Sequence, residues 1–423
     1  MLTNFFHKLG IIFSDKALRG RVVFILAAIA VFRLLAAVPV PGINRGALAQ
    51  FFGANAYLGL LSVFSGGGLH TVSLVLLGVT PYITASIIMQ LATVLFPKVK
   101  EMSSEEGEAG RARFIAISRY ITVPIAFLQA IAFLSLLQRE NILVPLSHMA
   151  LVVDILVVAA GSILLMWIGE LITEFGIGNG VSLIIFAGII SRIPSGIAQT
   201  LFTATSASIP AYAGFVALAV VVVYFVVVVA DAERTIPIAY ARQVRAGAGA
   251  APTYLPIRLL QAGVIPIIFA LSLLLLPQLV IAGLASTHII SNAIALQAWY
   301  TGFSNNTWAY SAVYFALVVM FTYFYTAITF EPHRVADNLQ KSGAFVPGVR
   351  PGRETENYIA KVVNRITLPG ALFLGVVAVI PFVIKALTGV SAILVGGTAL
   401  LIAVQVLLDL IRKIDAQVSL REY

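Results

Sequence analysis

Ten runs of apolar residues, each long enough to cross a lipid bilayer, recur along the chain of 423 residues. They are centred near residues 30, 83, 126, 160, 190, 221, 271, 320, 376 and 401. Because hydrocarbon cannot bond to backbone N–H and C=O groups, such runs predict transmembrane helices. Charged residues make up only 11% of the chain, whereas a soluble domain has about 25%. The sequence therefore predicts an all-α polytopic membrane protein and excludes an ordinary soluble fold.

The basic residues are concentrated on one side of the predicted membrane. Of 27 Lys and Arg residues, 22 lie at the termini, at adjoining span ends or in the connections 97–113, 173–180, 231–258 and 331–365. The five exceptions are Arg33, Arg45, Arg139, Arg192 and Lys385. Cytoplasmic loops of membrane proteins collect Lys and Arg, so both termini are predicted to be cytoplasmic. The net charge of +9 then needs no nucleic-acid partner to explain it.

The ten spans divide into two sets of five, an N-terminal half at 1–205 and a C-terminal half at 206–423. An odd number of spans in each half means that the halves enter the membrane from opposite faces. This is the inverted-repeat arrangement, in which a substrate path lies between the halves. The prediction rests on counting spans, since the two halves show no convincing sequence identity.

A broken helix is predicted between the first and second spans. The apolar segment 55–65 extends about half of a hydrocarbon core roughly 30 Å thick, whereas the segment 71–96 is long enough to cross it. A half-helix at membrane depth needs shelter from lipid, so the break indicates a pathway. Gly66, Gly67 and Gly68 between the two segments form either a tight turn or a hinge that lets the half-helix move.

The chain lacks the residues that membrane enzymes and ion-coupled carriers place at mid-membrane. The ionisable residues in or near the spans are interpreted as interfacial or structural: Arg33, Asp154, Glu170, Glu174 and Asp409. The five histidines show no metal-binding spacing, no GxSxG motif occurs, and there is no cysteine. We therefore expect no catalysis, no metal and no cofactor.

Two pairs of aliphatic residues are candidates for an apolar constriction, which would exclude water and ions by dewetting. Val79 and Ile83 are four residues apart, as are Ile185 and Ile189, so each pair lies on one face of its helix. Aliphatic residues at this spacing more commonly pack against lipid or a neighbouring helix. The position of the first pair, just after the broken helix, favours the constriction.

Two cytoplasmic loops, 231–258 and 331–365, are longer and more polar than connections need to be. Both combine basic residues with apolar ones expected to be exposed, which favours partner docking over a solvated hairpin. These apolar residues are Ile238, Tyr240, Phe345 and Val346. The segment VPGVRPG at 346–352 predicts a rigid turn that presents Arg350 to a phosphate or carboxylate. GIGNG at 176–180 predicts a tight cytoplasmic turn.

Five segments together resemble the SecY family in its bacterial form, whose members form the channel of the Sec protein translocase. They are LGVTPYITASIIMQL at 77–91, WIGELITEFGIGNGVSLIIFAG at 167–188, YLPIRLLQAGVIPIIFA at 254–270, ADNLQKSGAFVPGVRPG at 336–352 and GGTALLI at 396–402. They occur in the family's order and spacing, so the resemblance covers essentially the whole chain. It implies a passive channel in the bacterial cytoplasmic membrane for unfolded preproteins, which releases membrane segments laterally and has no enzymatic activity.

The resemblance also assigns roles to individual residues. The pore ring would comprise Val79, Ile83, Ile185, Ile189, Ile268 and Ile402. The plug would be the half-helix 55–65, with plug and hinge residues Leu58, Leu61, Phe64, Gly66, Gly67 and Gly68. The lateral gate, between the second and seventh spans, would include Thr84, Ile87 and Ser272. Partner docking would use Arg242, Arg245 and Arg350.

The implied partners are the small membrane subunits SecE and SecG, the SecA motor ATPase, the ribosome, signal peptides, preproteins and the lipid bilayer. Two other classes of function remain as alternatives. A secondary transporter could use the broken helix to hold a small substrate, but it would need a polar cluster at mid-membrane. An intramembrane protease would need a catalytic set, which the sequence lacks.

Overall fold

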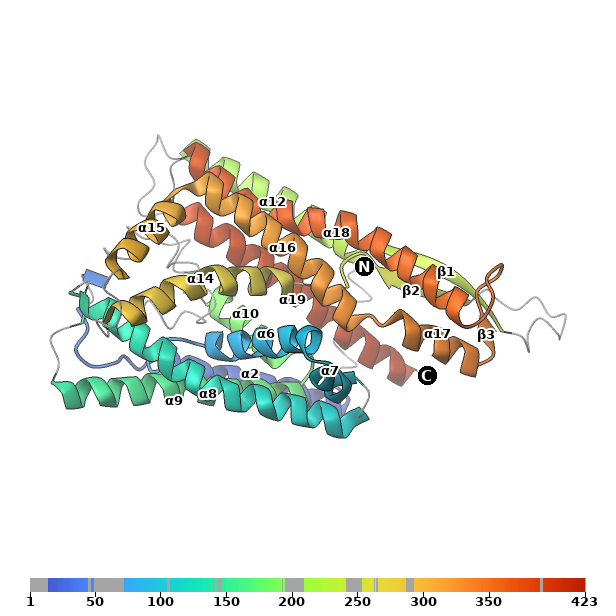
Figure 1. The fold of residues 1–423 in the computed structure, drawn as a ribbon, viewed down its shortest axis with the longest axis horizontal. Coiled ribbons are helices and arrows are strands. Elements are labelled where there is room, and N and C mark those ends of the chain that lie inside the picture. The colour runs from blue at the N-terminus through green and yellow to red at the C-terminus, as the bar shows by residue number, and fades with distance from the viewer. Residues whose placement is uncertain are drawn as a thin grey trace. The chain divides into compact units, whose positions relative to one another are not determined.

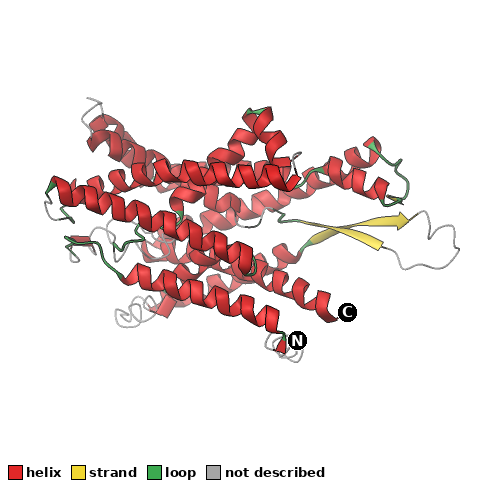
Figure 2. Cartoon of the chain, turned by 90° about the horizontal axis from the view of Figure 1, so that it is seen from below, coloured by secondary structure: helices red, strands yellow, loops and turns green. Residues whose placement is uncertain are grey.

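The computed structural model is dominated by helices, with one small sheet among the residues it describes (Figures 1 and 2). The described residues are 14–44, 47–48, 72–104, 107–139, 141–143, 147–191, 193–194, 209–240, 253–261, 263, 265–286, 293–388 and 391–422.

Each of the ten predicted span centres falls within a helix. These helices are α2 (Lys16–Ala37), α6 (Thr80–Leu95), α8 (Gly107–Arg139), α9 (His148–Phe175), α10 (Gly180–Ile190), α12 (Ile209–Asp231), α14 (Ile265–Ser286), α16 (Thr307–Thr329), α18 (Arg353–Thr388) and α19 (Ser391–Glu422). The shorter helices are α7 (Pro97–Ser104), α15 (Ala293–Asn305) and α17 (Pro332–Lys341).

Length and hydropathy identify five candidate membrane spans among the described residues, and four further apolar helices are shorter. The five are Lys16–Ala37, Gly107–Arg139, His148–Phe175, Thr307–Lys341 and Arg353–Ile384. The four are Thr80–Leu95, Gly180–Ile190, Ala219–Asp231 and Ile265–Gln278. In the candidate Thr307–Lys341, the apolar part is α16, whereas α17 is polar (PHRVADNLQK) and lies beyond it.

The second span is shorter than the predicted segment 71–96, so that expectation is wrong. Helix α6 begins at Thr80 and has 16 residues, which corresponds to about 24 Å. Pro81 lies in its first turn, where the N–H that proline lacks would have no helical partner. The residues before it form turns, and Val40 N–H donates to the Val72 carbonyl at 2.8 Å. Val72 has φ of 41°, an uncommon and strained conformation for a β-branched residue.

The chain divides into two compact units. Unit 1 comprises residues 1–215, 271–310 and 381–423, and unit 2 comprises 216–270 and 311–380. These units do not coincide with the predicted halves 1–205 and 206–423, because parts of the second half belong to unit 1. The inverted halves stay a prediction.

Unit 1 contains a series of helices in which each packs against the next: α6 on α8, α8 on α9, α9 on α10 and α10 on α19. One of its core clusters includes Phe133 and Leu137 of α8 with Val158 of α9. Gly161 of α9 lies so close to the turn before α6 that an added Cβ would lie 2.0 Å from the Leu74 carbonyl oxygen. The turn therefore rests directly on the backbone of α9.

The predicted turn at 176–180 is confirmed, and it is also a packing site. Gly178 has φ of 92°, and the Asn179 side chain accepts the Ser182 N–H at 3.1 Å to cap α10. The Thr173 hydroxyl donates to the Gly169 carbonyl at 2.8 Å and accepts the Gly180 N–H at 2.9 Å. A Cβ on Gly180 would lie 1.9 Å from the Gly169 oxygen. The two helices thus meet backbone to backbone, as small residues allow in membranes.

Unit 2 contains the sheet, whose strand order is β2-β1-β3. Strands β1 (Glu233–Tyr240) and β2 (Thr253–Arg258) pair in antiparallel register, with Ile236 opposite Leu255, and form the narrow ribbon seen in Figure 2. Strand β3 (Ala344–Phe345) pairs with the end of β1. The loop 231–258 is therefore built on a hairpin.

The expectation that the apolar loop residues are exposed is wrong. Ile238 and Val346 are buried, and Tyr240 and Phe345 are half-buried. Side chains alternate along a strand, and the inward Ile236 packs in one cluster with Ile257, Val346 and Ile359 of α18. The hairpin is thus partly packed against other residues of unit 2. The sequence pattern of the loop alone does not show these contacts, because they involve residues of β3 and α18.

Gly180→Ala is expected to destabilise the protein by about 1–3 kcal/mol, the usual cost of overpacking, because the methyl group would meet the Gly169 carbonyl. Thermal unfolding of the detergent-solubilised protein should show a lowered Tm. Gly214→Ala in α12 is the control, since its added methyl group would meet no neighbouring atom within 4 Å. Equal Tm values for the two variants would contradict the close contact.

Candidate pore and docking sites

The six predicted ring residues are all buried aliphatics, each at most 5% exposed. Ile83 donates its N–H to the Val79 carbonyl at 3.0 Å, which places the two residues one helical turn apart. Ile185 and Ile189 lie on α10, which packs against α19, the helix that carries Ile402. Ile268 lies in the part of α14 that belongs to unit 2. The joining of all six into one ring stays a prediction.

The three predicted gate residues, Thr84, Ile87 and Ser272, are also buried. The Thr84 hydroxyl donates to the Thr80 carbonyl at 3.0 Å and accepts a long hydrogen bond of 3.4 Å from Gln129 Nε2. The pair Thr84–Gln129 links α6 to α8 through side chains. Sequence reasoning missed Gln129, although an amide within the apolar run 121–137 was a signal that could have identified it.

The predicted plug and hinge lie outside the described residues, as do Arg242 and Arg245. Their assignments to Leu58, Leu61, Phe64, Gly66, Gly67 and Gly68, and to the tip of the loop 231–258, stay predictions.

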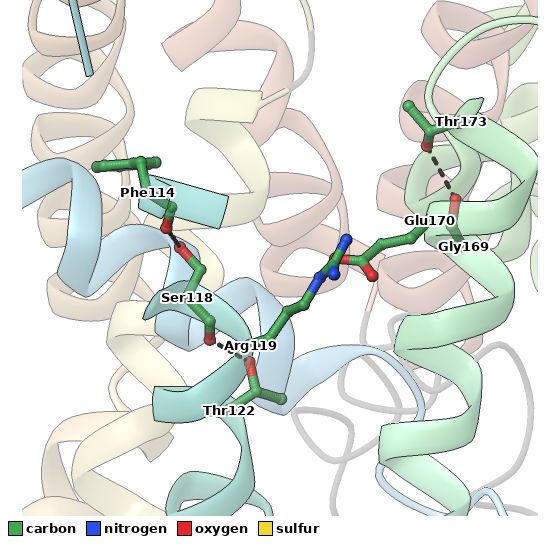
Figure 3. Close-up of polar contacts among 7 residues, drawn as sticks. All are labelled: Phe114, Ser118, Arg119, Thr122, Gly169, Glu170 and Thr173. Atoms are coloured by element: carbon green, nitrogen blue, oxygen red, sulfur yellow. Dashed lines mark hydrogen bonds and ion pairs between the residues drawn. The ribbon is translucent and has the colours of Figure 1, made fainter. Parts of the chain in front are cut away.

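An ion pair links α8 to α9 (Figure 3). Arg119 Nε lies 2.7 Å from Glu170 Oε1. Tyr120, directly after Arg119, and Trp167, three residues before Glu170, are exposed aromatics of the kind that occupy membrane interfaces. Half of the Arg119 side chain is exposed, so the pair contributes at most about 1 kcal/mol. The structural interpretation of Glu170 agrees with this contact.

The other ionisable residues of the spans differ in their surroundings. Asp409 pairs with Lys413 one turn later, with an N–O distance of 2.7 Å. Arg33 is half-buried and its guanidinium carbon lies 5.6 Å from the centre of the Phe32 ring. Asp154, expected near a span end, is buried inside α9, and its Oδ2 has no hydrogen-bond partner among the described residues. In the described part of the chain, no three His, Asp or Glu side chains are placed to hold a metal ion.

The predicted turn around Arg350 is confirmed. Gly348 has φ of 82° and Gly352 of 96°, a backbone conformation that glycine adopts without strain. The buried Thr355 donates its hydroxyl to the Arg350 carbonyl at 2.8 Å, which ties the turn to the first turn of α18. Arg350 itself is exposed. The turn thus holds the arginine backbone while the guanidinium stays accessible.

A hollow of about 540 Å³ lies beside this turn. It is lined by Gly348, Val349, Arg350, Glu354, Asn357, Tyr358 and Lys361. Two cations, one carboxylate, an amide and an aromatic ring therefore converge where the loop meets α18. Such a mixture of side chains is suited to binding a polar surface of another protein.

Helix α17 is joined to the same turn of α18 by a histidine. His333 Nδ1 lies 3.1 Å from Glu356 Oε2, and His333 Nε2 lies 3.5 Å from Asp337 Oδ2. The hydrogen bond to Glu356, with the negative charge of Asp337, raises the pKa of His333. The protonated imidazole strengthens both contacts, so the tie is strongest while His333 is protonated and weakens as the pH rises through the raised pKa of His333.

A family model and individual relatives both match this chain over most of its length. The SecY family model matches residues 73–411. The protein translocase subunit SecY of Mycobacterium tuberculosis is 38% identical over 431 residues, which cover 96% of each chain. That of Thermotoga maritima is 38% identical over 424 residues, covering 97% of this chain and 95% of the relative.

Solved structures share the fold. A structure described as a protein-conducting channel has a TM-score of 0.67 and 19% identity, with 93% of this chain and 91% of that chain covered. A second concerns a SecY protein whose plug domain stabilises the closed state and maintains a membrane seal. It has a TM-score of 0.69 and 20% identity, with 94% and 92% covered.

Proposed function

Because the chain belongs to the SecY family, we propose that it forms a protein-conducting channel in the bacterial cytoplasmic membrane. It translocates unfolded preproteins across the membrane and releases apolar segments laterally into the bilayer. The observation that carries this proposal is the continuous family match over residues 73–411, which includes every proposed ring and gate residue. The two inverted halves, 1–205 and 206–423, would enclose the path.

The proposed seal is apolar. Val79, Ile83, Ile185, Ile189, Ile268 and Ile402 would close around the path and exclude water and ions by dewetting. Aliphatic side chains suit this role because they contact any polypeptide without binding a particular side chain. The segment 55–65 would add a plug on the outer side, with Gly66–Gly68 as its hinge. A plug that maintains a membrane seal is described for the related SecY protein.

The proposed lateral gate lies between α6 and α14. Thr84 and Ile87 would line one side of the gate and Ser272 the other. Burial of these three side chains in the present state agrees with a closed gate. Gln129 of α8 holds the Thr84 hydroxyl through a hydrogen bond. A signal peptide would contact this polar pair as it leaves through the gate.

The proposed driving force comes from partners, since the channel itself is passive. SecA or a ribosome would dock on the cytoplasmic loops through Arg350 and through Arg242 and Arg245, and SecE and SecG would accompany the chain in the membrane. The exposed guanidinium on a tethered turn, beside a polar hollow, supports the docking role of Arg350. Two structures of similar fold are described as Sec61 in a canine ribosome–channel complex and as a yeast Ssh1 complex bound to the yeast ribosome.

A photo-crosslinking residue at Ile87 should form adducts with the signal peptide of a stalled preprotein, because Ile87 is buried on the proposed gate side of α6. The crosslinking residue placed instead at Ile88, which is 43% exposed, is the control and should react with lipid or a neighbouring subunit. Absence of preprotein adducts at Ile87 would contradict the channel function, and a small-solute carrier would give that result.

Ile83→Ser together with Ile189→Ser should make the resting channel leak ions, because hydroxyl groups hydrate an apolar constriction. Single-channel recordings in planar bilayers should show conductance that the unaltered protein lacks. Ile88→Ser on the exposed face of α6 serves as the control. If the double variant conducts no more than that control, the ring assignment is wrong.

Arg350→Glu should reduce SecA-driven import into inverted membrane vesicles at least tenfold while the protein remains folded and inserted. The reversed charge removes the cation from the docking surface, and the turn keeps its tie to Thr355. Arg353→Glu, three residues away and outside the hollow, should import normally. Normal import by the Arg350 variant would remove the docking role.

A further inference from the structure

Gln405 is a buried amide on α19 that has no bonding partner among the residues that the structure describes. Its side chain is 6% exposed, and neither Nε2 nor Oε1 makes a hydrogen bond within that part of the chain. Ile402, a proposed ring residue, lies three positions earlier on the same buried face of the helix. Leu407 and Ile411 are exposed and mark the opposite face. The amide therefore lies one helical turn from the proposed seal.

An unbonded amide at this position is unfavourable for packing alone. Each buried polar group without a partner costs about 1–3 kcal/mol. Several buried hydroxyls in other helices avoid that cost by bonding a carbonyl of their own helix, such as Ser162 to Val158 and Thr322 to Val318. Leucine has nearly the same size as glutamine and would fill the site without the penalty. The cost indicates that the amide bonds a group outside the described residues.

The chemistry of a primary amide matches a peptide backbone. Gln offers two N–H donors and one carbonyl acceptor, and an extended polypeptide offers one N–H and one C=O per residue. Two such groups can pair in a cyclic fashion whatever the side chains of the polypeptide are. With the C-terminus in the cytoplasm, Gln405 lies about 4.5 Å to the cytoplasmic side of Ile402. A chain that enters from the cytoplasm would pass the amide before the ring.

We propose that the side-chain amide of Gln405 hydrogen-bonds the backbone of a polypeptide entering the ring, once the ring has opened. This inference rests on the proposed function. The amide would bond the backbone of any polypeptide, just as the apolar seal would fit any side chain. Backbone groups of the polypeptide would then have a hydrogen-bond partner as they leave water and enter the ring. A water molecule in the same place would satisfy the amide equally well, but it would make the amide dispensable for transport.

The location is tested by photo-crosslinkers at positions 402, 405 and 407 of the full chain, with a preprotein stalled by a folded C-terminal domain. Adducts with the preprotein are expected at 402 and 405, and none at 407, which is on the exposed face. Adducts at 402 without adducts at 405 would overturn the inference and leave the channel function intact. Absence of adducts at all three positions would overturn both.

The role is tested with Gln405→Leu, which keeps the volume and removes the amide. Its Tm should equal or exceed that of the unaltered protein, and its preprotein import should be at least threefold slower. Val406→Leu, at the neighbouring buried position, is the packing control and should import at nearly the normal rate. Normal import by Gln405→Leu would overturn the proposal and would be the result expected if only water bonds the amide.

Discussion

The structure depends on one constraint, which is that backbone N–H and C=O groups inside a membrane must be bonded within the protein. The ten apolar segments satisfy this constraint as helices. Where the described backbone of unit 1 departs from a helix, other backbone groups or nearby side chains can bond it. The turn before α6 is the clearest example, since Val40 N–H donates to Val72 and Leu74 N–H donates to the Val38 carbonyl at 3.0 Å. The constraint thus explains both the helices and the form of their interruption.

Glycine allows backbone segments to approach the helices at distances that other residues would prevent. An added Cβ would lie 2.0 Å from the Leu74 oxygen at Gly161, 1.9 Å from the Gly169 oxygen at Gly180, and 2.6 Å from the Leu259 oxygen at Gly370. In a membrane, where lipid competes for apolar surface, such close packing is a main source of helix association. These contacts fix the turn before α6, the α9–α10 junction and, in unit 2, the approach of the segment after β2 to α18.

The proposed channel uses two kinds of surface that make different physical demands. The seal requires apolar groups that fit any sequence, and the six proposed ring residues are buried aliphatics. The docking surface requires charge held in a defined position, and Arg350 stands on a turn whose backbone is tied to Thr355. Neither surface needs a reactive group.

The sequence by itself determined the centres of the ten long apolar helices, the turns at 176–180 and 346–352, and membership of the SecY family. Apolar length, glycine and proline are local signals, and the backbone responds to them locally. Only the tertiary structure decided that α6 starts at Thr80, that Ile238 and Val346 are buried, that Gln129 reaches Thr84, and that Gln405 has no partner among the described residues. These facts depend on which segments meet in space. The sequence shows whether a residue is polar or apolar. Whether a polar group finds a hydrogen-bond partner depends on neighbours from distant parts of the chain.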